Sequence, residues 1–137
     1  MRKEICLIVL AGCFFAFAMI GCGSSSSTPT SQAVGADILQ KYNFHVVGQP
    51  TSTSLTLPLQ FTDANWGLKE TTCQGAGYDL TPFAGQDITS IQYSIAEKYF
   101  GTSLSLNVLA KGQTSICGFV VNGAVPGIIA VNNPDIK

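Results

Sequence analysis

Hydrophobic and polar positions follow two different periods along the chain, and these periods predict its elements. A helical period is clearest where Val34, Ile38 and Tyr42 recur four residues apart. We expect Ser31 to cap this first helix, and Asn43 to end it in a left-handed conformation.

A second helix is predicted over residues 59–73, because proline is favoured in the first turn of a helix and Pro58 stands just before it. Gly75 and Gly77 are expected to end this helix. Its predicted buried stripe consists of Phe61, Ala64 and Leu68.

Short strands are predicted at residues 44–47 and 54–57, and after residue 85 the period of the apolar positions becomes two. The last predicted strands are centred on Ile91/Tyr93/Ile95, on Leu104/Leu106/Val108, on residues 115–121 and on residues 128–131. Asn122-Gly123 signals a hairpin, and Pro126 implies an edge position or a bulge. The predicted fold class is α+β, with two helices packed on one face of a mainly antiparallel meander of about four strands.

The N-terminal residues carry a targeting pattern. Arg2 and Lys3 precede an apolar run from Ile5 to Ile20, which is borderline for a membrane-spanning helix and fits a secretory signal better. The alternative is a signal-anchor helix that stays uncut.

The run ends in Met19-Ile20-Gly21-Cys22, which resembles the lipobox of bacterial lipoproteins. The resemblance implies cleavage before Cys22, with a diacylglycerol on the Cys22 thiol and an acyl chain on its new amino group. Several acyl chains suffice for stable anchoring in a membrane. Gly23, where an aspartate favours retention in the inner membrane, implies an exported protein on the outer membrane, or on the outer face of the cell membrane in a host with one membrane.

These assignments divide the chain into residues 1–21 as signal peptide, 22–32 as a serine-rich flexible tether, and 33–137 as a single small α+β domain. The exported part has five lysines, seven acidic residues and no arginine. Such a near-neutral balance without a basic cluster argues against nucleic-acid binding. The expected partners are the membrane, through the lipid on Cys22, and an envelope protein or peptide.

The chain has five cysteines, of which Cys6 and Cys13 leave with the signal and Cys22 is lipidated. Cys73 and Cys117 remain, and in an oxidising compartment a disulfide is the expected state. Two separate buried thiols are the alternative, and a zinc site lacks further ligands nearby.

A second resemblance rests on Leu57-Pro58-x-x-Phe61, on Gly77-Tyr78-Asp79-Leu80-x-x-Phe83-x-Gly85, and on Val120-x-Asn122-Gly123-x-Val125-x-Gly127. Together they resemble a family of small exported bacterial domains of unknown function. The similarity covers roughly residues 36–131, and this chain departs from the family in its less charged meander and its cysteine pair. The resemblance implies a fold and no chemistry.

No catalytic motif is recognisable, and neither a cofactor nor a metal is expected. The one enzyme hypothesis that we consider is a tethered hydrolase with Cys117 as nucleophile, His45 as base and Asp79 to orient the histidine. Asp79 is otherwise expected to cap a turn through its side chain. The remaining carboxylates are scattered along the sequence, at Asp63, Glu70, Asp87 and Glu97.

Trp66 and Tyr78 are candidate binding residues, able to line a groove for a peptide or a glycan, although both also fit core or rim positions. The edge strand that contains Pro126 is a candidate for strand addition by a partner. The sequence therefore favours a lipid-anchored, non-catalytic binding or accessory module of the cell envelope. A hydrolase and a small inhibitor or immunity-type protein are the alternatives.

Overall fold

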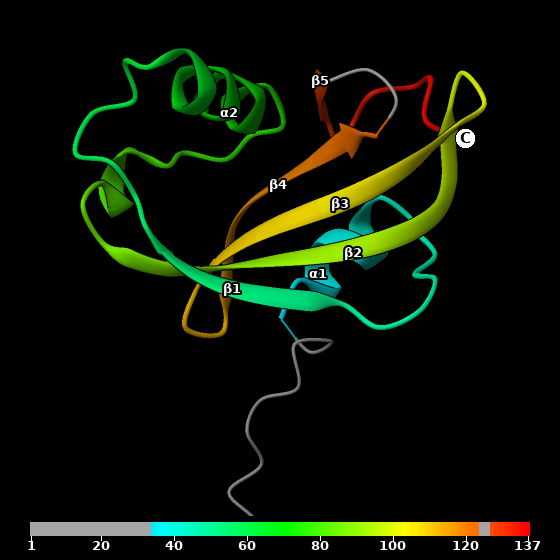
Figure 1. The fold of residues 1–137 in the computed structure, drawn as a ribbon, viewed down its shortest axis with the longest axis horizontal. Coiled ribbons are helices and arrows are strands. Elements are labelled where there is room, and N and C mark those ends of the chain that lie inside the picture. Colours follow the sequence, from blue (N-terminus) through cyan, green and yellow to red (C-terminus); the bar gives the residue numbers. More distant parts are fainter. Residues whose placement is uncertain (1–33, 124–126) are drawn as a thin grey trace, which may run out of the picture.

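The computed structural model describes residues 34–123 and 127–137. The elements run in the order α1 (Ala36–Lys41), β1 (Thr51–Thr56), α2 (Ala64–Gly75), a 3-10 turn (Thr81–Phe83), β2 (Asp87–Tyr99), β3 (Thr102–Lys111), β4 (Thr114–Asn122) and β5 (Gly127–Ala130). The strands form one antiparallel sheet in the order β1-β2-β3-β4-β5 (Figure 1).

The predicted α+β class is confirmed, but the sheet has five strands and not about four. The additional strand is β1, which overlaps the short strand predicted at residues 54–57 and joins the sheet by pairing with the first half of β2, from Thr51 opposite Gln92 to Thr56 opposite Asp87. Its side chains are mostly hydroxyls, so the apolar period that marks the inner strands is nearly absent from it. The strand predicted at residues 44–47 is reduced to a single bridge between Val46 and Ile95.

The predicted faces of β2 and β3 are confirmed. Tyr93 lies opposite Leu106 and Ile95 opposite Leu104 in the register, and all four side chains are buried. Two strands with a period of two bury one face each when their apolar positions lie opposite one another.

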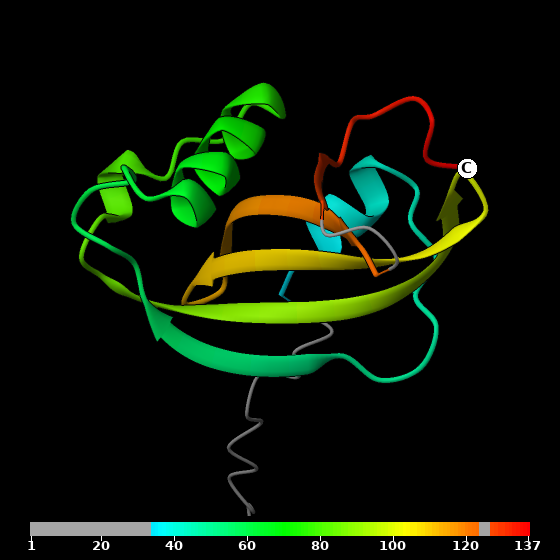
Figure 2. The ribbon, with the colours of Figure 1, turned by 45° about the horizontal axis from the view of Figure 1, so that its top comes forward.

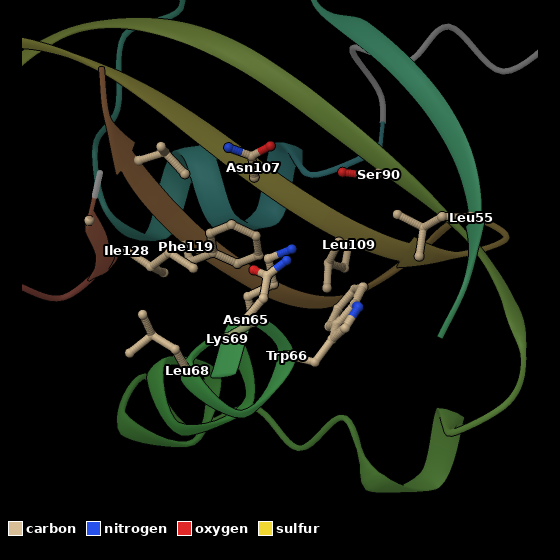
Figure 3. A pocket seen from close by; sticks show the side chains of 12 residues that line it. Leu55, Asn65, Trp66, Leu68, Lys69, Ser90, Asn107, Leu109, Phe119 and Ile128 are labelled. Carbon is tan, nitrogen blue, oxygen red and sulfur yellow. The ribbon is translucent and has the colours of Figure 1, made fainter. Parts of the chain in front are cut away.

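The two helices contact opposite faces of β4, so the prediction that both pack on one face is wrong. A β-carbon on Gly118 would lie 2.9 Å from the Ile38 Cδ1 atom, which places α1 on the Gly118 side. Its neighbour Cys117 faces α2 and pairs there with Cys73. Successive side chains alternate between the faces of a strand, so α1 and α2 lie on the two sides of β4. Figure 3 shows α1 behind the strands and α2 below them, and Figure 2 shows both helices and the sheet in a second view.

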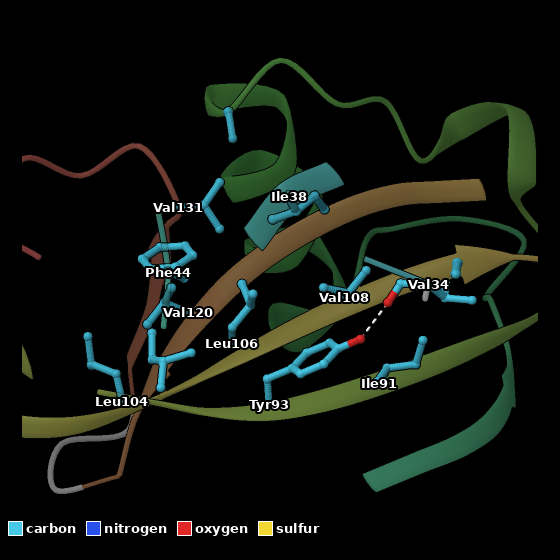
Figure 4. Close-up of a cluster of buried hydrophobic side chains, with 13 residues drawn as sticks. Val34, Ile38, Phe44, Ile91, Tyr93, Leu104, Leu106, Val108, Val120 and Val131 are labelled. Carbon is cyan, nitrogen blue, oxygen red and sulfur yellow. Dashed lines mark hydrogen bonds between the residues drawn. The ribbon is translucent and has the colours of Figure 1, made fainter. Parts of the chain in front are cut away.

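The larger hydrophobic cluster lies on the α1 side of the sheet (Figure 4). Ile38 of α1 and Phe44 pack there against the buried face of the central strands. The Tyr93 hydroxyl donates a short hydrogen bond to the Val34 carbonyl, so the start of the described chain is attached to the middle of β2. The burial of its phenol raises the pKa of Tyr93, with a smaller contribution from the Asp37 charge.

The left-handed end of the first helix is confirmed, because Asn43 has a φ of 56°. The N-terminal residue of α1 differs from the prediction. The helix begins at Ala36 after Gly35, whose φ of 88° suits glycine, and the predicted cap Ser31 lies outside the described residues.

The second helix begins five residues later than predicted. The Asp63 carboxylate accepts the backbone N–H groups of Asn65 and Trp66, at 3.0 and 2.9 Å, and so caps α2. Pro58 precedes a loop and not the first helical turn. Consequently the predicted stripe is wrong: Ala64 is exposed, and Leu68 is half exposed.

Several sequence assignments fall outside the described residues, namely the signal peptide and tether over 1–32, the lipid acceptor Cys22, and the edge residue Pro126. In the part of the chain that the structure describes, no helix is long and apolar enough to cross a membrane.

Candidate functional site

The helix α2 presents an unusual set of side chains to the sheet. Asn65, Trp66 and Lys69 lie on the helical face that continues to the buried Cys73. A helix that covers a sheet normally presents aliphatic residues to it. Here the amide of Asn65, the indole of Trp66 and the ammonium group of Lys69 take most of those places. Leu68 is the one aliphatic residue of α2 in the pocket lining.

A pocket of about 410 Å³ lies between this face of α2 and the sheet (Figure 3). Its apolar lining consists of Leu55, Leu109, Phe119, Val121 and Ile128, from four different strands, together with Trp66 and Leu68 of α2. Its polar lining consists of Asn65 on the helix, Ser90 on β2 and Asn107 on β3. An apolar floor with a few separate polar groups is the usual composition of a small-molecule site.

Lys69 brings the one cationic group into this lining. Its Nζ atom lies 4.2 Å from the centre of the Trp66 ring and 6.0 Å from that of Phe119. Burial lowers the pKa of Lys69, and the charge of Asp63 opposes that shift. Among the described residues no carboxylate lies within 4.0 Å of this ammonium group.

The position of Trp66 is stabilised from the side of the loop that precedes the helix. Phe61 packs against Trp66, with 6.4 Å between the ring centres. The same loop crosses the helix closely, because a β-carbon on Gly67 would lie 2.9 Å from the Phe61 carbonyl oxygen. Gly67 therefore permits the close approach that holds one wall of the pocket.

The structure separates the two predicted binding aromatics. Trp66 lines the pocket, whereas Tyr78 packs beside Tyr42 and lies 5.5 Å from the Lys41 ammonium group. Burial raises the pKa of Tyr78 to about 12, with further contributions from the charge and the hydrogen bond of Tyr42 and from the charge of Asp37. Tyr78 thus connects the ends of the two helices and is no part of the pocket.

Cys73 and Cys117 are both fully buried and joined in the structure, with their Cα atoms 5.7 Å apart, a separation compatible with a disulfide. The pair links α2 to β4. In this bonded state the Cys117 sulfur is no thiolate and cannot attack a substrate.

The structure does not bring together the proposed partners of Cys117. The exposed His45 lies beside Glu97, with 2.7 Å between Nδ1 and Oε1, and Glu97 also accepts the His45 backbone N–H. Asp79 caps a turn as predicted, because its carboxylate accepts the Thr81 N–H at 2.9 Å. The hydrogen bond of the Thr81 side chain, and after it that of the Thr81 backbone, lower the pKa of Asp79.

The other carboxylates have local partners: Asp63 caps α2, and Asp87 accepts the Thr56 hydroxyl at 2.5 Å. Over residues 34–123 and 127–137, no three histidine, cysteine or acidic side chains gather closely enough to hold a metal ion.

No protein-family model, no curated protein and no solved structure matches this chain. Both resemblances drawn from the sequence, to lipoproteins and to a family of small exported domains, therefore stay predictions.

The sequence pointed to one pocket residue, Trp66, and missed the rest. Lys69 and Asn65 had a usable signal, because once Asp63 is taken as the cap they fall on the same helical face as Cys73. Ser90 and Asn107 had none, because they are ordinary polar positions of half-buried strands.

Proposed function

We propose that this protein is a lipid-anchored, non-catalytic binding module of the cell envelope. Its ligand is a small amphipathic anion, with an apolar body and one carboxylate or phosphate group, and it enters the pocket between α2 and the sheet. The observation that carries this proposal is the half-buried Lys69 ammonium group above an apolar floor, with no carboxylate paired to it among the described residues.

The charge argument favours an anion over a neutral ligand. Lys69 is already partly desolvated, which is the reason for its lowered pKa. A ligand carboxylate at this position would form a charge-assisted hydrogen bond, and such bonds are stronger where water is excluded. The apolar body would meanwhile cover Leu55, Leu68 and Ile128, lining residues with exposed apolar surface.

The polar groups would then orient the ligand. Asn107 and Ser90 lie on the neighbouring strands β3 and β2, and Asn65 lies on the helix opposite. Their amide and hydroxyl groups can donate to a second oxygen of the anionic group. The anchor on Cys22 would hold this pocket near the envelope surface, and the tether would give it reach.

The experiment uses Trp66, which is the single tryptophan of the chain. Decanoate, decanol and decyltrimethylammonium are titrated below their micellar concentrations while Trp66 emission is followed. Decanoate is expected to bind most tightly. Lys69→Gln should weaken decanoate by about tenfold and leave decanol unchanged, because it removes only the ion pair.

Two variants serve as controls. Lys69→Arg should retain the preference for decanoate, because it keeps the charge. Lys111→Gln should change nothing, because Lys111 donates to the Asp87 carbonyl away from the pocket. Equal affinity for the three amphiphiles, or no saturable change in emission, would refute the proposed ligand class. The intact mass of the membrane-extracted protein tests the anchor separately.

A further inference from the structure

The hairpin between β2 and β3 has an aromatic residue where its backbone favours a small polar one. The turn consists of Phe100 and Gly101 alone, with φ values of 46° and 79°. Two-residue turns with both φ values positive strongly prefer Asn-Gly, Asp-Gly or Gly-Gly. A bulky side chain in the left-handed region is uncommon and strained.

Phe100 also contributes little to the core. Its side chain is 79% exposed, and its described ring contact is an edge-on one with Tyr99, at 4.6 Å between ring centres. Neither the backbone nor the packing of the domain therefore explains a phenylalanine here. A strained residue with an exposed apolar side chain points to a contact outside the folded chain.

The tip that carries Phe100 is firmly supported. Tyr99 pairs with Thr102 of β3 on one side and with Ile136 on the other. Lys98 and Lys137 exchange backbone hydrogen bonds next to it, at 2.6 and 3.0 Å, so both lysines lie at the base of the tip. The exposed Val47 lies at the same end of the sheet, where it donates its N–H to Ser94 of β2.

A phenylalanine at the tip and lysines at its base match the layers of a membrane interface, where the acyl chains lie deeper than the charged headgroups. Aromatic side chains enter the boundary between headgroups and acyl chains, and lysine ammonium groups remain among the headgroup phosphates. Glu97, the acidic residue that precedes Lys98 in the sequence, is bonded to His45 and so competes less for Lys98.

The tip can reach the bilayer if Cys22 carries lipid, an assumption that this inference takes from the proposed function. Val34 is attached to Tyr93, and Phe100 lies seven residues further along the chain, just past the end of β2, which corresponds to at most about 23 Å. The eleven residues 23–33 can extend to about 36 Å. The anchor also raises the local concentration of the tip at the surface, so that a contact too weak to act alone can form.

We propose that the β2–β3 hairpin is a second membrane contact, which inserts Phe100 into the interface and orients the tethered domain on the bilayer. With Phe100 against the lipid, the domain would rest on the hairpin end of its sheet. The opposite end, where the exposed Leu59 lies beside Gly85 before the start of β2, would face away from the bilayer.

The test compares two indole probes at these opposite ends. Full-length protein, made with its own leader and extracted from membranes, is reconstituted into phosphatidylcholine–phosphatidylglycerol vesicles with brominated acyl chains, which quench tryptophan on contact. Both variants carry Trp66→Phe, so that the added indole is the only one. Phe100→Trp should be quenched by about twofold or more, whereas Leu59→Trp, at a position that is 81% exposed, should not be.

The possible outcomes distinguish a membrane contact from a protein partner, and both from a failure of the lipid anchor. Equal quenching of both probes, or none of Phe100→Trp, would overturn the membrane contact. A blue-shifted Phe100→Trp emission in native membranes without quenching by bromolipid would assign the tip to a protein partner instead. Intact mass reports the lipid on Cys22 independently, so an unlipidated protein would refute the anchor and a lipidated, unquenched one would refute only the tip.

Discussion

At the scale of single residues, the left-handed backbone of Phe100 destabilises the fold, and its exposed ring makes few contacts that would offset this cost. Replacing it by asparagine creates Asn-Gly, the pair that this turn prefers. We expect Phe100→Asn to raise the free energy of unfolding by about 1 kcal/mol, because asparagine tolerates the left-handed region. Thermal unfolding followed by circular dichroism would measure the change.

The matched control is Phe100→Ala, which removes the ring but keeps a side chain that disfavours positive φ. Its unfolding temperature should rise less than that of Phe100→Asn. If the two variants gain equally, the cost lies in the exposed ring and not in the backbone.

Single residues are also where the sequence was most informative. Asn43 adopts the left-handed conformation that its place after an apolar helical stripe predicted, and Asp79 caps a turn as predicted. Both effects act within a few residues of the side chain, so no distant contact is needed to anticipate them. The surroundings of the Lys69 ammonium group could not be anticipated in this way, because they include the ring of Phe119, fifty residues away in the sequence.

At the scale of elements, Gly118 controls the contact between α1 and β4. A methyl group there would meet Ile38 at 2.9 Å, so we expect Gly118→Ala to destabilise the protein by about 1–3 kcal/mol. Adding Ile38→Val removes the opposing Cδ1 atom and should restore part of the loss. Denaturant unfolding of the two single variants and the double variant would give the coupling.

Gly75→Ala provides the comparison, because a β-carbon at Gly75 meets nothing within 4 Å and alanine favours the helix. It should leave stability unchanged or raise it slightly. Additive effects of Gly118→Ala and Ile38→Val would show that the two residues do not compete for one space.

The link between Cys73 and Cys117 ties α2 to β4 across a separation of 44 residues. In the chain-entropy description, closing such a loop contributes about 4 kcal/mol. We expect the double variant Cys73→Ala/Cys117→Ala to lose about that much in denaturant unfolding, and reductant to have no further effect on it. Alkylation of either cysteine in the native wild-type protein without reductant would contradict the disulfide.

Two predictions about the elements were wrong: the start of α2 and the placement of both helices on one face of the sheet. Pro58 and Asp63 both resemble helix starts in isolation, and the structure uses the aspartate because the loop before it packs Phe61 against Trp66. The opposite placement of the helices had a signal in the sequence, namely the apolar run Ile116-Cys117-Gly118-Phe119-Val120, and all five of these residues are buried in the structure. A strand that is buried without alternation is covered on both faces.

At the scale of the whole molecule, the tyrosines between the layers make stability depend on alkaline pH. Burial raises the pKa of Tyr78 from 10.0 to about 12. Between these values the unfolded chain loses the proton first, so stability is complete below pH 10 and falls as the pH rises toward 12. Tyr78→Phe should flatten this fall in denaturant midpoints, and only partly, because burial also raises the pKa of Tyr93. Parallel profiles for wild type and variant would contradict this assignment.

The sequence by itself determined what depends on neighbouring residues: the α+β class, the two-residue period of β2 and β3, the left-handed Asn43 and the Asp79 turn. Tertiary structure decided what depends on chain segments far apart. It placed the helices on opposite faces of β4, paired β1 with the sheet edge, and assembled the pocket from α2 and all five strands around Lys69. Local propensities act over a few residues, whereas a pocket exists only when packing brings its walls together.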